Sequence, residues 1–311
     1  MNWKATIELI AVITIITSVA MFSGCLEEKI SAVGDLGISS SFMDSGESKV
    51  EKIDIDPDTY LNTRTNLLAS KVDYELALNI LNNATTDYDE EREIIELNKI
   101  ICSYNLDYVN VLQNLNVCLK HLDKAYIYMV GDDLTSIRSE LKISENAINE
   151  AALFTTYAKE KCNGIDIDID ADTLSEQSKS KILEDRISIE ENEKMIVEIG
   201  KMISGLYPYV NGTEHLSNAV SYIDDENWSA AKTELKKSSS NFSKSKNIFE
   251  DLKNSEFSEV SYTAIAIDGA LGKMIECVGY YERGCKYADG GDFKNASYEF
   301  GKGLIALESV A

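Results

Sequence analysis

The sequence predicts an all-α protein built from stacked long helical hairpins, and three observations lead to this fold class. Only 2 prolines and 17 glycines occur among 311 residues, so few positions interrupt a helix. Apolar residues recur at spacings of three, four and seven, which places them on one face of a helix. A related pattern also returns several times along the chain, as expected where each hairpin packs against its neighbours.

The first 24 residues have the organisation of an export signal peptide. Lys4 supplies a positive charge, and an apolar stretch extends from residue 9 to residue 22. This stretch is short for a membrane-spanning helix, which needs about 20 apolar residues. Small residues then directly precede Cys25. An uncleaved N-terminal anchor is the alternative interpretation, and both interpretations predict that the rest of the chain lies outside the cell.

The segment Phe22-Ser23-Gly24-Cys25 resembles the lipobox of prokaryotic lipoproteins. In that family a thioether lipid is placed on the cysteine sulfur, and cleavage occurs just before it. The resemblance implies that residues 1–24 are removed and that Cys25 is the lipid-attachment residue. The protein is then expected to be extracytoplasmic, anchored to the outer face of the cell membrane.

The remaining chain is expected to divide into four parts. Residues 25–58 carry glycines, serines and acids without sustained periodicity, which predicts a flexible acidic tether after the lipidated cysteine. Helical hairpins are expected over 59–162 and again over 173–311. An acidic connector at 163–172 is the expected boundary between these two halves.

The periodic stretches divide further into individual helices. Gly205 and Pro208 are expected to end one of them, because proline disrupts a helix interior. The expected helices lie near residues 59–70, 73–87, 89–129, 133–161, 173–204, 213–223, 227–253, 257–288 and 292–309.

Four segments of the chain align without gaps and form an internal repeat. Each has an apolar helical stripe, a short turn, a large apolar residue and small residues at fixed offsets. We expect each segment to be a helical hairpin, in which the small residues allow close approach and the large residue fills the space where the helices diverge. Asp133, Asn227 or Asp292 can cap the second helix. The segments are 61–84, 121–144, 215–238 and 280–303, and their large residues are Tyr74, Leu134, Trp228 and Phe293.

One copy, Tyr287-x-x-Gly290-Gly291-Asp292-Phe293-x-x-Ala296, resembles the central part of a tetratricopeptide repeat. The resemblance covers less than a third of the chain and implies stacked helix pairs. Typical members of that family repeat about every 34 residues. Equivalent positions 68, 128, 222 and 287 are here 60, 94 and 65 residues apart, so the intervening helices must be longer.

Histidine and cysteine residues provide no clear reactive group. His121 and His215 occupy the same position in two copies of the repeat, where another copy has Tyr280, so we interpret both as structural. Five cysteines remain after Cys25, and no pair has the spacing of a redox or zinc motif. We expect them to be buried as small apolar residues.

An aspartate cluster in the connector is the candidate metal site. Asp166, Asp168, Asp170 and Asp172 alternate with other residues, like the first half of an EF-hand calcium loop. The turn and closing positions of that loop do not match. We therefore favour an extended connector whose isoleucines, including Ile165, pack inward while the aspartates face solvent.

Net charge and missing motifs restrict the function. A formal net charge of −23 argues against binding nucleic acid, because phosphate backbones would repel the chain. No GxSxG, HExxH or GxxxxGK[ST] motif occurs, so we expect neither catalysis nor a cofactor. The leading hypothesis is a membrane-anchored helical-repeat scaffold for a protein or peptide partner. The alternative is a ligand- or calcium-binding surface lipoprotein.

Overall fold

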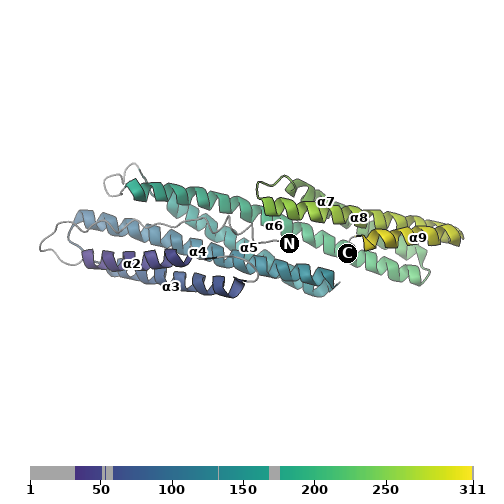
Figure 1. Cartoon of the computed structure of the whole chain (residues 1–311), viewed down its shortest axis with the longest axis horizontal. Helices are drawn as coiled ribbons and strands as arrows, with labels where there is room; N and C mark the ends of the chain where they lie inside the picture. Colours follow the sequence, from purple (N-terminus) through teal and green to yellow (C-terminus); the bar gives the residue numbers. More distant parts are fainter. Residues whose placement is uncertain (1–31, 51–52, 54–58, 132, 168–175, 310–311) are drawn as a thin grey trace. The chain divides into compact units, whose positions relative to one another are not determined.

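The structure is a computed structural model that describes residues 32–50, 53, 59–131, 133–167 and 176–309 (Figure 1). Within these ranges every regular element is an α-helix, which confirms the predicted all-α fold class. The helices are α2 (Ala32–Val50), α3 (Tyr60–Asn83), α4 (Asp89–Val130), α5 (Leu134–Asn163), α6 (Glu176–Asp224), α7 (Trp228–Leu252), α8 (Ser258–Asp289) and α9 (Phe293–Glu308).

The chain divides into two compact units. The C-terminal unit comprises the described parts of His121–Glu145 and Glu198–Ala311, and the N-terminal unit comprises those of Asn2–Lys120 and Asn146–Val197. The division therefore falls within α4, α5 and α6. This differs from the sequence-based expectation, which placed the boundary at the connector 163–172.

In the C-terminal unit, helices that follow one another in the chain pack against one another. Tyr207 on α6 donates a hydrogen bond to Glu145 on α5 at 3.2 Å. Further along, α7 packs against α8 and α8 packs against α9. The repeat segments 121–144, 215–238 and 280–303 each contain the end of one helix, a turn and the start of the next. The predicted hairpins are confirmed in these three copies.

Short turns close these hairpins in the manner that the sequence predicts. Asn227 and Asp292 are the N-caps of α7 and α9, and their side chains accept hydrogen bonds from Ala230 N and Asn295 N. Gly291 adopts a φ of 79°, which glycine tolerates without steric cost. Each cap satisfies a backbone N–H group that has no partner inside its helix.

Glycine and serine bring α6 and α7 into close contact. Ser238 and Ser245 on α7 donate hydrogen bonds of 2.8 and 2.7 Å to the carbonyl oxygens of Gly212 and Gly205 on α6. A Cβ atom at Gly212 would lie 2.6 Å from the ring of Phe242, which is fully buried. Both pairs are seven residues apart on their helices, so one face of each helix carries the contact.

The N-terminal unit repeats this contact between α2 and α3. Ser70 donates a hydrogen bond of 2.8 Å to the Gly46 carbonyl, and a Cβ atom at Gly46 would approach Tyr74 to 3.1 Å. The long helix α4 then packs on α3, where the Cys102 thiol lies 3.0 Å from the Tyr74 carbonyl oxygen. Lys161 on α5 also pairs with Asp107 on α4 at 2.5 Å.

The tether expected over 25–58 is wrong for residues 32–50. These residues form α2, whose Ser39, Met43 and Gly46 are buried. The sequence of α2 has no strong apolar stripe, because small residues supply much of its contact with α3. Packing rather than local periodicity therefore determines this helix.

The first repeat copy, 61–84, is also not a hairpin. Its residues 61–83 belong to the single helix α3, and Ala84 is the C-cap of that helix. Tyr74 is fully buried in the middle of α3 rather than beside a turn. The other large residues are less buried than predicted. Leu134 and Trp228 are half-buried, whereas Phe293 is mostly exposed.

The expected end of a helix at Gly205 and Pro208 is wrong as well. α6 continues through both residues to Asp224. Proline removes one helical hydrogen bond, but Leu206 and Val210 on either side are buried. The burial of these neighbours outweighs the tendency of proline to end a helix.

Replacing Gly212 by alanine should destabilise the protein by about 1–3 kcal/mol, because the added methyl group would overlap a fully buried ring. Urea unfolding followed by circular dichroism measures the change. Gly200→Ala on the same helix is the matched control, because its Cβ atom would meet nothing within 4 Å. It should leave stability unchanged or raise it by up to about 1 kcal/mol. Equal losses for both variants would contradict the close-contact interpretation.

Candidate functional site

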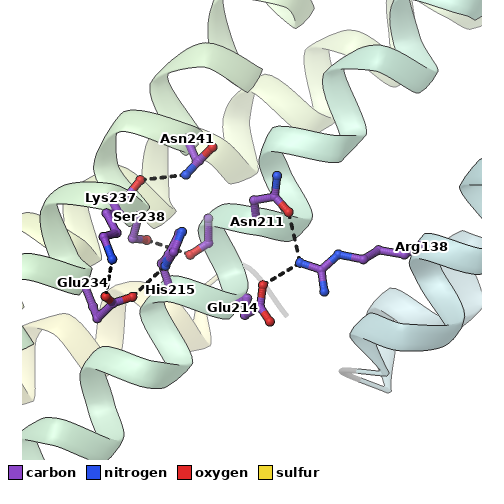
Figure 2. Close-up of polar contacts among 9 residues, drawn as sticks. Arg138, Asn211, Glu214, His215, Glu234, Lys237, Ser238 and Asn241 are labelled. Atoms are coloured by element: carbon purple, nitrogen blue, oxygen red, sulfur yellow. Dashed lines mark hydrogen bonds and ion pairs between the residues drawn. The ribbon is translucent and has the colours of Figure 1, made fainter.

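A glutamate recurs at one position in each hairpin of the C-terminal unit. Glu140, Glu234 and Glu299 each lie 19 residues after the first residue of their repeat copy. His121 Nδ1 pairs with Glu140, and His215 Nδ1 lies 2.6 Å from Glu234 Oε2 (Figure 2). In the copy that has Tyr280 instead of histidine, the Arg283 guanidinium donates to Glu299 Oε2 at 2.6 Å.

These contacts join the two helices of each hairpin, which agrees with a structural role for the histidines. Glu234 also accepts a hydrogen bond from Lys237 at 2.7 Å (Figure 2). The ammonium of Lys237, and then the His215 imidazole, hold the pKa of Glu234 below its usual value. A carboxylate held by two nitrogen donors is a strong acceptor and a poor general base.

Arg138 links one hairpin to the next. Its guanidinium, on α5, donates to Glu214 Oε2 at 2.6 Å and to Asn211 Oδ1 at 3.0 Å on α6 (Figure 2). The Arg138 hydrogen bond is also the main cause of a lowered pKa for Glu214. The polar groups in this region therefore serve to hold α5, α6 and α7 together.

The N-terminal unit contains a different polar cluster, and this one is buried. Asp185 on α6 is 3% exposed, and its Oδ2 atom accepts a hydrogen bond of 2.8 Å from the Tyr104 hydroxyl on α4. Seven residues further along α6, the Asn192 side chain donates a hydrogen bond of 3.1 Å to the Tyr108 hydroxyl. Two tyrosines of α4 are thus matched to two polar residues of α6 that are seven positions apart.

This buried cluster is incompletely hydrogen-bonded within the described part of the chain. Asp185 Oδ1, the Tyr74 hydroxyl and Lys181 Nζ have no hydrogen-bond partner there. Lys181 Nζ lies 3.7 Å from Glu47 Oε1 on α2. The Glu47 side chain is buried, and Lys181 is half-buried. Burying charges without full hydrogen bonding is costly, so a neutral form of Asp185 is favoured.

Burial accordingly raises the pKa of Asp185 to about 7, although the Tyr104 hydrogen bond and the nearby Lys181 charge act in the opposite direction. Burial also raises the pKa values of Tyr74 and Tyr104 well above the usual range. The cluster can therefore take up and release one proton near neutral pH.

The five cysteines after Cys25 are buried, as predicted, and they form no disulfide with one another. Burial raises the pKa of Cys102, Cys162 and Cys277 to about 12 and that of Cys285 to about 11. The pKa of Cys118 is raised by the same cause. Thiols in this state are poor nucleophiles.

The sequence-predicted lipid and metal residues lie mostly outside the described part of the chain. Cys25, Asp168, Asp170 and Asp172 are outside it. Asp166 is within it and exposed, and Ile165 is buried beside it as expected. Among the described residues, no group of three or more histidine, cysteine or acidic side chains could hold a metal ion.

The Asp185 cluster was not predicted from the sequence, although a signal for it was present. Ile182, Ile189 and Ile196 form a buried stripe along α6. Asp185 and Asn192 lie within this stripe at heptad spacing, where polar residues are unusual. Polar residues inside an apolar stripe indicate a buried polar layer, but their partners on α4 required the structure.

Comparison with known proteins gave no match to a family model, a curated protein or a solved structure. No helix in the described part of the chain has the length and apolar character needed to cross a membrane.

Replacing Asp185 by asparagine should stabilise the protein at pH 8 more than at pH 4. The pKa of Asp185 in the folded state lies above the unfolded value of 3.8. The contribution of the protonated Asp185 to the free energy of unfolding is therefore fully present below about pH 4. It is lost as the pH rises through about 7. The gain in the free energy of unfolding that the substitution gives should be larger at pH 8 than at pH 4 by at most about 4 kcal/mol.

Urea unfolding of both proteins across this pH range measures the effect. Glu191→Gln, which neutralises an exposed acid on the same helix, is the control and should show little pH-dependent gain. A constant difference between wild type and Asp185→Asn at all pH values would show that folding does not raise the pKa of Asp185.

A double-mutant cycle with His215→Ala and Glu234→Ala should give a coupling free energy of about 1 kcal/mol, because the pair is only partly buried. Unfolding of the two single variants and the double variant provides the measurement. As a comparison, the non-contacting pair His215 and Glu282 should give a coupling close to zero. No coupling between His215 and Glu234 would mean that their contact contributes nothing to holding α6 against α7.

Proposed function

We propose that this protein is a lipoprotein anchored outside the cell through Cys25, and that its C-terminal unit is a helical-repeat scaffold for a partner protein. An exposed apolar face on α9 carries the proposal. Phe293 and Ile305 are 61% and 67% exposed, and Tyr298 and Leu304 are also exposed. Single exposed apolar residues are ordinary, whereas several on one short helix are typical of an interaction surface.

The repeat gives a reason for this exposed face. α7 and α9 are the second helices of successive hairpins, and α7 packs against α8, the helix that follows it. Trp228 at the start of α7 is half-buried, whereas Phe293 at the equivalent position of α9 is mostly exposed. The outer face of α9 therefore offers a partner the kind of surface that α7 offers to α8.

The composition of this face suits a protein partner. It combines two aromatic and two aliphatic side chains, and aromatic residues are enriched at protein interfaces. A Cβ atom at Gly301, in the middle of the face, would meet nothing within 4 Å, so a partner backbone has room to approach. Lys302 lies 4.3 Å from the centre of the Tyr298 ring and keeps that ring at one edge of the face. An amphipathic helix is the partner element that fits.

Replacing both Leu304 and Ile305 by serine should reduce cross-linking to the partner at least tenfold, because the complex loses the burial of two large aliphatic side chains. Cross-linking in intact membranes followed by mass spectrometry identifies and quantifies the partner. Intact-mass analysis of the same purified chain should find a mature N-terminus at a lipid-modified Cys25.

The matched control replaces Leu183 and Ile187 by serine, which are similarly exposed but lie on α6 in the N-terminal unit. This control should leave cross-linking unchanged. Equal cross-linking in all three proteins would contradict a docking role for α9. A full-length chain with an intact first residue in the cytosol would contradict the proposed location and anchor.

A further inference from the structure

A second exposed apolar stripe runs along α3. Leu61, Leu68, Val72 and Leu76 are between 41% and 72% exposed. Their spacing of seven, four and four residues places them on one face of the helix, over a length of about 22 Å at 1.5 Å per residue. The opposite face of α3 is fully packed, with Leu67, Tyr74, Ala77 and Leu81 buried. The stripe is therefore a second apolar face on a well-packed helix.

The chain holds the first residue of α2 close to the proposed lipid-attachment residue. Ala32, the first residue of α2, is only seven positions after Cys25. A chain of this length reaches at most about 25 Å, whatever its conformation. α2 packs along α3, with Gly46 against Tyr74. An anchored chain therefore keeps the α2–α3 pair near the lipid headgroups, whereas a tether over 25–58 would have held it away.

The charge of α3 permits this proximity. The whole chain has a net charge of −23, and anionic headgroups would repel most of its surface. α3 has two bases, Arg64 and Lys71, against two acids, Asp73 and Glu75, so its net charge is zero. Asp73 is also paired with Lys49 of α2. The only exposed acid on the helix is then Glu75.

The side chains of the stripe fit lipid better than another copy of the chain. They are all aliphatic, with none of the aromatic residues that mark the α9 face. Aliphatic side chains on a helix that lies in the membrane interface sink about 5–10 Å into the headgroup region.

We propose that the Leu61–Leu68–Val72–Leu76 face of α3 lies on the lipid surface of the membrane to which the chain is anchored. This inference rests on the proposed anchoring through Cys25. The membrane contact gives the anchored protein a fixed orientation, because α2 and α3 then lie along the bilayer.

Photo-cross-linking of the full chain, purified with the anchor it carries and reconstituted in phosphatidylcholine vesicles, tests the proposal. The photoreactive residue is introduced by the substitution Leu68→p-benzoylphenylalanine. The control has the same substitution at Ile187, which is 58% exposed in the same unit but flanked by exposed acids such as Glu184 and Glu190. Mass spectrometry should find at least five times more phosphatidylcholine adduct at position 68 than at position 187.

The outcomes separate this inference from the proposed function. Thermal unfolding of both variants should match wild type, because both positions are exposed. A lipid-modified Cys25 with equal or no adducts at the two positions would overturn the membrane contact of α3 while leaving the anchor intact. A cross-link from position 68 to a second copy of the chain would also overturn it. A chain without lipid on Cys25 would contradict the anchor itself.

Discussion

The fold depends on a close helix-to-helix contact in which a serine hydroxyl bonds to the backbone carbonyl of a glycine. Ser238 and Ser245 make this contact with Gly212 and Gly205, and Ser70 makes it with Gly46. In each case an aromatic ring four residues after the serine lies against the glycine. The missing Cβ atom provides the space, and the hydrogen bond of the hydroxyl offsets the cost of removing it from water, so a polar residue can be fully buried.

The two units use polar residues differently around this shared contact. In the C-terminal unit, glutamates such as Glu234 and Glu299 are paired with cationic or imidazole nitrogens at the margin of the core. In the N-terminal unit, Asp185 is buried and Lys181 is half-buried, and both have unfilled hydrogen-bonding capacity. Buried polar groups that lack some of their hydrogen bonds weaken the packing of this unit. They also make the stability of the unit depend on their protonation.

The all-α class, the hairpins at three repeat copies and the capping residues could be predicted because they depend on local spacing and turn chemistry. α2 could not, since Ser39 and Gly46 give little apolar periodicity and are buried only because α3 covers them. Pro208 is a strong local signal for a helix end, but tertiary packing overrides it. The Asp185 cluster depends on which helix faces α6, and heptad spacing alone does not identify Tyr104 as the partner.

The buried thiols allow local unfolding of each unit to be measured without an added probe. Cys102, Cys118 and Cys162 belong to the N-terminal unit, and Cys277 and Cys285 belong to the C-terminal unit. A thiol that is both buried and fully protonated reacts with an alkylating reagent only after its surroundings unfold. The rate of modification at each cysteine therefore measures how often its own unit opens, without any label that alters the core.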